Sequence, residues 1–269
     1  MPTDTDVGER DDRLTVIAIS VLAYVVQDLL HEGLGHGVTA WLSGAHRLTM
    51  STVALQSDIG SRWISANGTL ANLATGGIFW MILRSPQRYA PATRYFFVMT
   101  MAGSFFTGFG YFFYSGVAGF GDWEAVIRGL QPHWAWRLGL IGIGAATYYA
   151  SMLVVAEALK PFQATGGNGG RLRALCWTPY FSEGVLAGLG GLLNPIGIFY
   201  VLTSALASTL GANAGLLPMP GFVRWVSGEG GGDVEQAPPI RRSAAWIAAG
   251  AVAGAIFVFV LGRGITWTR

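Results

Sequence analysis

The sequence has little charge and almost no cysteine. Only 12% of its 269 residues are charged, which is about half the share found in a soluble domain. The single cysteine, Cys176, excludes an intrachain disulfide framework and a cysteine-rich zinc module. The net charge of +2 gives no reason to expect a nucleic-acid partner. These deficits exclude a water-soluble globular enzyme, a secreted disulfide scaffold and a disordered protein.

The sequence is instead rich in apolar residues and in glycine. Hydrophobic residues make up 52% of the chain, and the mean hydropathy is +0.44. The 39 glycines are about twice the average share, and small residues let helices pack closely in a bilayer. The expected fold class is an all-α polytopic membrane protein, and its expected surroundings are membrane lipid.

Long uncharged stretches predict about six transmembrane helices, since a crossing needs about 20 apolar residues. The first helix begins at Leu14 and continues to Leu42. Four further stretches each fit one crossing: 63–83, 95–121, 138–156 and 243–262. The stretch 184–223 is too long for one plain crossing. Its Asn194-Pro195 pair predicts a broken helix, because proline lacks the N–H and clashes with the preceding turn. One crossing plus a re-entrant piece fits this stretch, and so do two short crossings.

The remaining segments complete this outline. Residues 1–13 lack the basic start and the cleavage site of a signal peptide, so we expect a disordered tail ahead of a retained helix. Residues 45–62 alternate in polarity and favour a small β-hairpin, with a turn at Ser57-Asp58-Ile59-Gly60. With six crossings, Lys and Arg divide ten to seven in favour of the N-terminal side, which favours a cytoplasmic N-terminus. We expect a multi-pass integral protein of the bacterial inner membrane.

Four ionisable residues lie close together in the first predicted helix: Asp28, His31, Glu32 and His36. Such residues are costly inside a membrane and point to function. Two histidines flanking a glutamate suggest a metal held by neutral imidazoles, with the carboxylate placed to activate water. Zinc is the expected cofactor, although the sequence does not separate zinc from iron. The alternative is a polar cluster that pairs with neighbouring helices.

The spacing of the two histidines does not suit a regular helix. The zinc-protease pattern H-E-x-x-H places its histidines at i and i+4, whereas His31 and His36 are five residues apart. On a regular helix the two rings would point roughly 140° apart. One π-bulge absorbs the extra residue, and Gly33 and Gly35 make it cheap. Without a bulge, Asp28, Glu32 and His36 form one stripe, which suggests a carboxylate-rich metal site instead.

Three motifs follow one another in the first half of the chain. The stretch His31-Glu32-Gly33-Leu34-Gly35-His36-Gly37, with Ala40 and Ser43-Gly44, is similar to an H-E-x-G-H-A helix with one inserted glycine. After the expected hairpin, Gly68-Thr69-Leu70-Ala71-Asn72 is similar to G-P-x-x-N, with threonine in place of proline. Gly121-Asp122-Trp123 stands where an L-D-G aspartate would follow. In this order the motifs resemble those of the site-2 protease-like intramembrane zinc metalloproteases.

The resemblance implies a metalloprotease-like membrane core at residues 14–130, followed at 131–269 by additional transmembrane helices with flexible loops. It implies that His31, His36 and Asp122 hold zinc, with Glu32 as the general base. It also implies that Asn72 positions the substrate backbone. The substrate would be a membrane-tethered protein.

Other residues compete for the third ligand position. Asn194 stands in Leu193-Asn194-Pro195-Ile196-Gly197, which is similar to an N-P-D-G variant of the family motif with isoleucine in place of aspartate. A neutral amide is a poor zinc ligand, so Asn194 ranks below Asp122. Asp58 is expected to form a turn, and the best functional role for Asp28 is to orient an imidazole from the second shell.

Two further functions stay open beside a zinc endopeptidase. The extra residue in the histidine motif, Thr69 and Trp123 all depart from the family pattern. These departures favour a non-proteolytic metal-binding scaffold or an accessory subunit of a larger complex. A third hypothesis is a transporter whose site lies at the Asn194-Pro195 break, since broken helices line binding sites.

Overall fold

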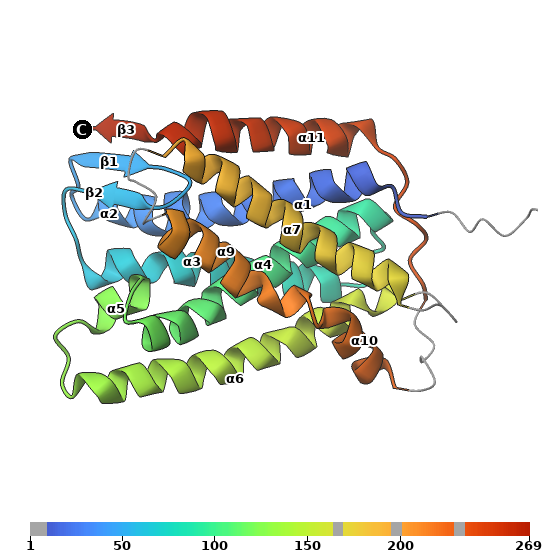
Figure 1. The fold of residues 1–269 in the computed structure, drawn as a ribbon, viewed down its shortest axis with the longest axis horizontal. Helices are drawn as coiled ribbons and strands as arrows, with labels where there is room; N and C mark the ends of the chain where they lie inside the picture. Colours follow the sequence, from blue (N-terminus) through green and yellow to red (C-terminus); the bar gives the residue numbers. More distant parts are fainter. Residues whose placement is uncertain (1–9, 164–168, 195–200, 229–234) are drawn as a thin grey trace, which may run out of the picture.

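The computed structural model describes residues 10–163, 169–194, 201–228 and 235–269. Most of these residues are in helices that lie side by side along one long axis (Figure 1). Residues 1–9 of the predicted tail lie outside the described residues. The first helix begins at Arg13, where the Asp12 carboxylate accepts a hydrogen bond from the N–H of Thr15 at 2.9 Å, as an N-cap residue does.

The first helix has three consecutive parts, which are α1 (Arg13–Asp28), the π-helical η1 (Leu29–Gly37) and α2 (Val38–Leu42). The helices that follow up to residue 192 are α3 (Arg62–Arg84), α4 (Pro91–Ala118), α5 (Asp122–Ile127), α6 (His133–Leu159), η2 (Lys160–Phe162) and α7 (Gly170–Leu192). Those after residue 200 are η3 (Val201–Leu206), α9 (Ala207–Ala212), η4 (Asn213–Leu216), α10 (Met219–Ser227), α11 (Ala244–Ala255), η5 (Ile256–Val260) and η6 (Leu261–Arg263). The predominantly α-helical fold class is therefore confirmed.

Four helical segments of the described chain are long and apolar enough to cross a membrane: 13–42, 91–118, 133–162 and 244–263. They correspond to four of the predicted crossings. The predicted stretch 63–83 is also helical, as the 23-residue α3, but it is not among these four. Four of the predicted crossings thus have a helix long and apolar enough to span a membrane, and the estimate of about six is not confirmed.

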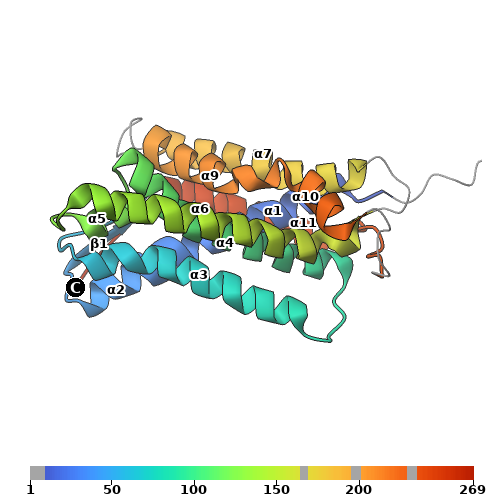
Figure 2. The same ribbon diagram turned by 90° about the horizontal axis from the view of Figure 1, so that it is seen from below.

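The predicted crossing at 184–223 has different bounds. Helix α7 begins at Gly170 and ends at Leu192, and α9 and α10 then run back along the bundle (Figures 1 and 2). The uncharged-run criterion missed the first half of α7 because the run begins only after Glu183, which is buried and accepts a hydrogen bond from the amide of Asn213 at 2.9 Å. Two arginines near the start of the helix also have partners. Arg171 pairs with the carboxylate of Asp11 at 2.9 Å, and Arg173 lies over the ring of Trp177. The helix ends just before Asn194, while Pro195 lies outside the described residues.

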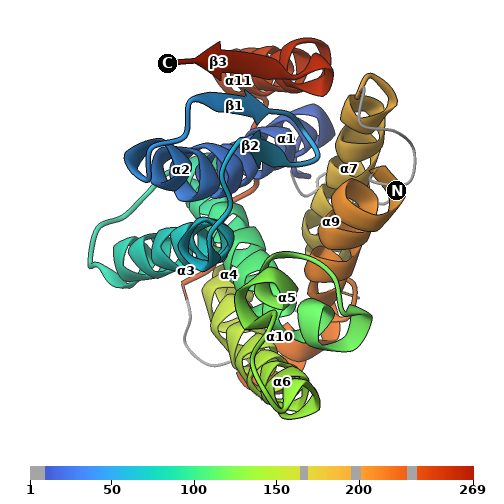
Figure 3. The same ribbon diagram turned by 90° about the vertical axis from the view of Figure 1, so that its left-hand side faces the viewer.

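A small sheet packs at one end of the bundle, which we call the hairpin end (Figure 3). Strands β1 (Arg47–Met50) and β2 (Leu55–Ser57) form the predicted antiparallel hairpin. The turn between them is at Ser51–Ala54, where the Ser51 N–H bonds to the Ala54 carbonyl, so the predicted turn at 57–60 is wrong. A third strand, β3 (Ile265–Thr268), pairs antiparallel with β1. Because β1 and β3 pair across more than 200 residues, no local signal predicted β3.

Asp58 therefore has a different place from the one expected. It follows β2, and its carboxylate accepts hydrogen bonds from the backbone N–H groups of His46 and Arg47 at 3.1–3.2 Å. The bond from Arg47 is the main reason why the pKa of Asp58 lies below its usual value. Asp58 ties the start of β1 to the end of β2.

The core joins α1, α4, α6 and α7. Tyr95 and Phe106 on α4 are fully buried, and the hydroxyl of Tyr95 donates to the carbonyl of Leu175 on α7 at 2.7 Å. Helix α11 crosses α1 at Gly250, where a Cβ atom would lie 2.3 Å from the carbonyl oxygen of Ala18. Only glycine allows this approach of two backbones.

We expect Gly250→Ala to lower the free energy of unfolding by about 1–3 kcal/mol, because the added methyl group forces the two helices apart. Gly142→Ala is the matched control, since no atom lies within 4 Å of its Cβ position. This control should raise stability by about 0.5–1 kcal/mol through helix propensity. Unfolding in mixed micelles measures both, and equal stability of the two variants would contradict the packing argument.

Candidate metal centre

The π-helical turn η1 confirms the predicted irregularity between the two histidines. It extends over nine residues, Leu29–Gly37, and brings His31 and His36 to the same side of the helix. Their ring centroids are 4.7 Å apart, and their Nε2 atoms are 3.2 Å apart. The alternative stripe of Asp28, Glu32 and His36 required a regular helix, which the structure does not have.

Two glycines let η1 and α3 cross beside the histidines. A Cβ atom at Gly35 would lie 2.5 Å from the Cα of Gly68. A Cβ atom at Gly68 would lie 2.3 Å from Nε2 of His36 and 2.8 Å from Nε2 of His31. A side chain at position 68 would therefore occupy the space that both imidazoles face.

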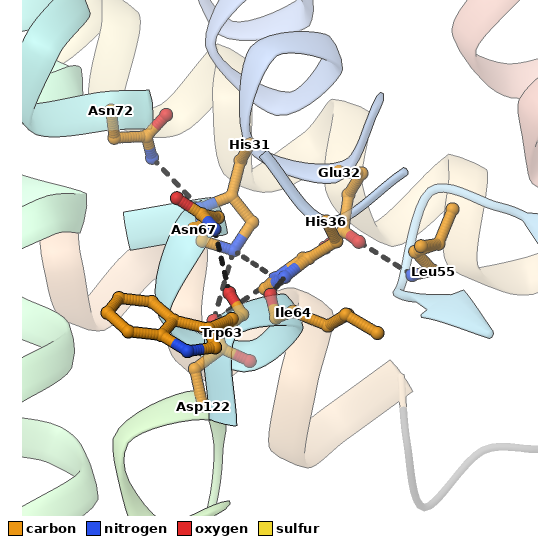
Figure 4. A network of polar contacts seen from close by, with 9 residues as sticks. All are labelled: His31, Glu32, His36, Leu55, Trp63, Ile64, Asn67, Asn72 and Asp122. Carbon is orange, nitrogen blue, oxygen red and sulfur yellow. Dashed lines mark hydrogen bonds and ion pairs between the residues drawn. The ribbon is translucent and has the colours of Figure 1, made fainter. Parts of the chain in front are cut away.

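Asp122 completes the group from a third element. After α4, Gly119 and Gly121 adopt positive φ angles of 62° and 90°, which L side chains rarely adopt. They turn the chain so that Asp122, the first residue of α5, points back at the histidines (Figure 4). Its Oδ2 atom lies 3.3 Å from Nε2 of His31 and 3.3 Å from Nε2 of His36.

The three ligand atoms form a nearly equilateral triangle with edges of 3.2–3.3 Å. In a tetrahedral zinc site with bonds of 2.0–2.1 Å, neighbouring ligand atoms are about 3.3–3.4 Å apart. The triangle thus has the size of one face of such a tetrahedron, and a metal ion just above its plane would contact all three atoms. The group His31, His36 and Asp122 could hold a metal ion, as the sequence predicted.

Hydrogen bonds orient both imidazoles so that their Nε2 atoms could bind a metal ion. Nδ1 of His36 donates to the carbonyl of Ile64 at 2.6 Å, which leaves the lone pair of Nε2 facing Asp122. The Asn72 amide lies 3.2 Å from Nδ1 of His31, and its buried oxygen has no hydrogen-bond partner. With the amide turned by 180°, Nδ1–H of His31 donates to that oxygen and frees Nε2 as well. Such bonds fix the tautomer of metal ligands.

The chemistry of Asp122 also fits a metal ligand. Apart from the two imidazoles 3.3 Å away, its buried Oδ2 atom has no hydrogen-bond partner among the described residues. Burial raises the pKa of Asp122, but a protonated His36 and hydrogen bonds from both histidines more than offset this, so the pKa lies well below its usual value. A metal ion held by neutral imidazoles would supply the same positive charge. Asp122 is therefore ionised, and a carboxylate must be ionised to bind a metal.

Glu32 lies beside the triangle but points to the hairpin. It is buried, with 8% of its surface exposed, and its Oε2 atom accepts a hydrogen bond from the N–H of Leu55 at 2.6 Å. Glu32 and His31 also line a polar cavity of about 40 Å³. A cavity of this size holds one or two water molecules.

The other predicted residues have different positions. Asp28 lines the same small cavity, but among the described residues no hydrogen bond joins it to an imidazole, and its buried Oδ2 atom has no partner. Asn72 contacts His31 and also lines the small cavity, and its role toward a substrate stays a prediction. Asn194 lies two residues beyond the end of α7, and its role as a ligand stays a prediction.

The sequence analysis missed three contributions to the site. These are the carbonyl of Ile64, the N–H of Leu55 and the absence of a side chain at Gly68. The first two are backbone groups, which no residue type signals. Gly68 was part of a quoted motif, but only the crossing of η1 and α3 shows why glycine is needed there.

No family model matches the chain, and no curated protein or solved structure matches it either. The fold and the site together define a helical protein whose described residues include four helices able to cross a membrane and a largely buried His–His–Asp group able to hold a metal ion.

We expect Gly68→Ala to abolish metal binding, because the new methyl group would occupy the space between the two imidazoles. Gly77→Ala on the same helix is the control, since its Cβ position is open. Metal analysis of the purified variants should give about one ion per chain for Gly77→Ala and none for Gly68→Ala. Full metal content in Gly68→Ala would show that the ion binds at another place in the protein.

We expect Asn72→Leu to weaken metal affinity by about 10- to 100-fold, as loss of a hydrogen bond to a ligating histidine typically does. Asn67→Leu serves as the control, because the Asn67 side chain donates only to the carbonyl of Trp63 in its own helix. Competition with a metal chelator measures both affinities. Equal affinities in the two variants would assign Asn72 a role outside the metal centre.

Proposed function

We propose that the protein is a zinc-dependent intramembrane endopeptidase of the site-2 protease type. The observation that carries this proposal is the triangle of His31, His36 and Asp122, whose edges suit tetrahedral zinc. The order of the three sequence motifs supports it, as does the position of Glu32 next to a ligating histidine. The three residues leave a fourth coordination position open, as catalytic zinc sites do.

Zinc would lower the pKa of a bound water to about 7 and polarise a peptide carbonyl. The chain itself would supply the base and the geometry. Oε2 of Glu32 is held by the N–H of Leu55, which leaves its other oxygen to accept a proton. The substrate would be a membrane-tethered segment that unwinds, since a helix hides its carbonyls in its own hydrogen bonds.

The distribution of basic residues supports an orientation in the membrane. Strand β3 lies at the hairpin end, opposite to the start of α1 (Figure 1), so Arg263 and Arg269 belong to the hairpin end. The expected division of Lys and Arg between the two sides of the membrane, ten to seven, therefore changes. Eleven basic residues lie at the end where α1 begins: Arg10, Arg13, Arg84, Arg88, Arg94, Lys160, Arg171, Arg173, Arg224, Arg241 and Arg242. The other six lie at the hairpin end, which favours a cytoplasmic N-terminus.

This orientation places the metal centre toward the far side of the membrane. His36 lies six residues before Leu42, the last residue of the first helix, and hence about 9 Å from its end. Exposed tryptophans mark this end of the bundle, with Trp63 and Trp134 at 72% and 66% exposure. Tryptophan is enriched at membrane interfaces. We propose a multi-pass protein of the bacterial inner membrane whose site opens near the non-cytoplasmic interface.

One observation favours a second function, a non-proteolytic metal-binding scaffold or accessory subunit. The Glu32 carboxylate already has a structural partner in the N–H of Leu55. In a scaffold this bond would be the whole role of Glu32, tying the hairpin to the metal-bearing helix. The two functions make opposite predictions for a variant that keeps the bond and removes the base.

That variant is Glu32→Gln, whose side-chain amide oxygen still accepts from Leu55. The endopeptidase proposal predicts a loss of cleavage by about 10²- to 10⁴-fold, the usual contribution of general-base catalysis, with metal content unchanged. Membranes from cells that carry the wild type or the variant would be compared for new protein N-termini that lie inside membrane segments. The variant should abolish such termini.

His36→Ala is the companion variant, because it removes a metal ligand. The endopeptidase proposal requires both variants to lose cleavage and only His36→Ala to lose metal. Normal cellular function in Glu32→Gln together with loss of function in His36→Ala would establish the scaffold instead. A wild-type protein without bound metal would overturn both functions.

A further inference from the structure

A second cavity lies on the opposite side of the metal-bearing helix. It has a volume of about 560 Å³ and separates the sheet from η1 and α2. We call it the sheet cavity. Its lining residues are Gly33, Gly37, Val38, Trp41, Ala45, His46, Leu48, Met50, Leu55, Trp267, Thr268 and Arg269. Its volume is that of a small-molecule site, and most of these side chains are apolar.

One face of the sheet forms a wall of this cavity. Side chains alternate between the two faces of a strand, so Leu48 and Met50 of β1 face the cavity. Trp267 pairs with Leu48 in the sheet register and lies on the same face, and Arg269 follows two residues later. A sheet face presents side chains rather than backbone N–H and C=O groups, because the backbone groups point to the neighbouring strands.

The mouth of the cavity carries positive charge. Arg269 is held there, since its backbone N–H donates to the carbonyl of His46 at 2.8 Å. Its guanidinium lies over the ring of Trp41, 5.9 Å from the ring centre. Among the described residues, no aspartate or glutamate side chain lines the sheet cavity. An anion at the mouth would therefore meet Arg269 and a donor on His46, while the nearby Asp58 carboxylate lies outside the lining and bonds to the backbone N–H groups of His46 and Arg47.

The position of the mouth relates it to the membrane surface. Trp41 and Trp267 are 55% and 48% exposed at the hairpin end, where Trp63 and Trp134 are exposed too. Side chains of this kind lie at headgroup depth. The sheet cavity thus combines an apolar interior with a cationic mouth at the depth of lipid phosphates.

We propose that the sheet cavity binds an anionic phospholipid, with an acyl chain inside it and the phosphate against Arg269. A peptide fits the same cavity less well. Its backbone polar groups would find no partners on a sheet face, and burying them unpaired is costly. An acyl chain has no such groups. The lipid would contact Gly33 and Gly37, and hence the turn that carries His31 and His36. The lipid proposal does not depend on which reaction, if any, takes place at the metal centre.

The first test compares Arg269→Gln with Arg47→Gln. Arg47 is the matched control, because it lies on β1 but on the face turned away from the cavity and does not line it. The full-length protein is purified in detergent with equal amounts of phosphatidylglycerol and phosphatidylcholine, and bound lipid is counted by native mass spectrometry. We expect the wild type and Arg47→Gln to retain phosphatidylglycerol about fivefold over phosphatidylcholine, the effect of one basic residue near a membrane surface.

Arg269→Gln should bring this ratio close to one. Equal retention of the two lipids by the wild type, or an equal loss of preference in Arg47→Gln, would overturn the proposal. A retained peptide in place of a lipid would also overturn it.

A second pair of variants tests the cavity itself. Val38→Trp would fill the cavity from the helix side, whereas Leu42→Trp changes a neighbouring residue that is 82% exposed and outside the lining. We expect Val38→Trp to lose retained phosphatidylglycerol by at least fivefold and Leu42→Trp to keep it. Unchanged retention in a folded Val38→Trp protein, judged by its metal content, would show that the lipid binds elsewhere.

Discussion

The site depends on one constraint, which is that two histidines five residues apart must face the same point. A regular helix separates them by roughly 140°, so the helix must accommodate one extra residue. The π-helical turn at Leu29–Gly37 does this. Its glycines limit the strain of the turn and let it approach α3 closely. Gly35 and Gly68 bring the two backbones together, and only this close approach leaves the imidazoles facing a common space.

The ligand atoms come from elements that are far apart in sequence, and each is fixed by a neighbour of its own. His36 is held by the carbonyl of Ile64, and His31 by the amide of Asn72. Asp122 is aimed by the positive φ angle of Gly121. Since α3 supplies both orienting groups and the glycine at the crossing, it acts as the rigid support of the centre. Two imidazoles and one carboxylate that converge in this way form a group that could hold a metal ion.

Much of this was accessible from the sequence, for physical reasons that can be named. The spacing of His31 and His36 predicted the π-helical turn, because the helix period is fixed, and the alternation in 45–62 predicted the hairpin. The resemblance of the motifs pointed to Asp122. The start of α7 was missed, since Glu183 interrupts the uncharged run but is paired with Asn213 inside the bundle, and Arg171 and Arg173 find partners at its end. Strand β3 was missed because its pairing with β1 is entirely non-local.

In the proposed endopeptidase, the Glu32 carboxylate would have both a structural bond and a chemical role. A hydrogen bond to a charged group contributes about 1.5–3 kcal/mol, so breaking the bond between Oε2 and Leu55 during catalysis would add to the barrier. A base that acts through Oε1 while Oε2 stays bonded avoids this cost. The bond then fixes the carboxylate relative to the histidines, and fixed groups are what lower a barrier through orientation. The hairpin is therefore part of the site's geometry, and any movement of β2 would move the base with it.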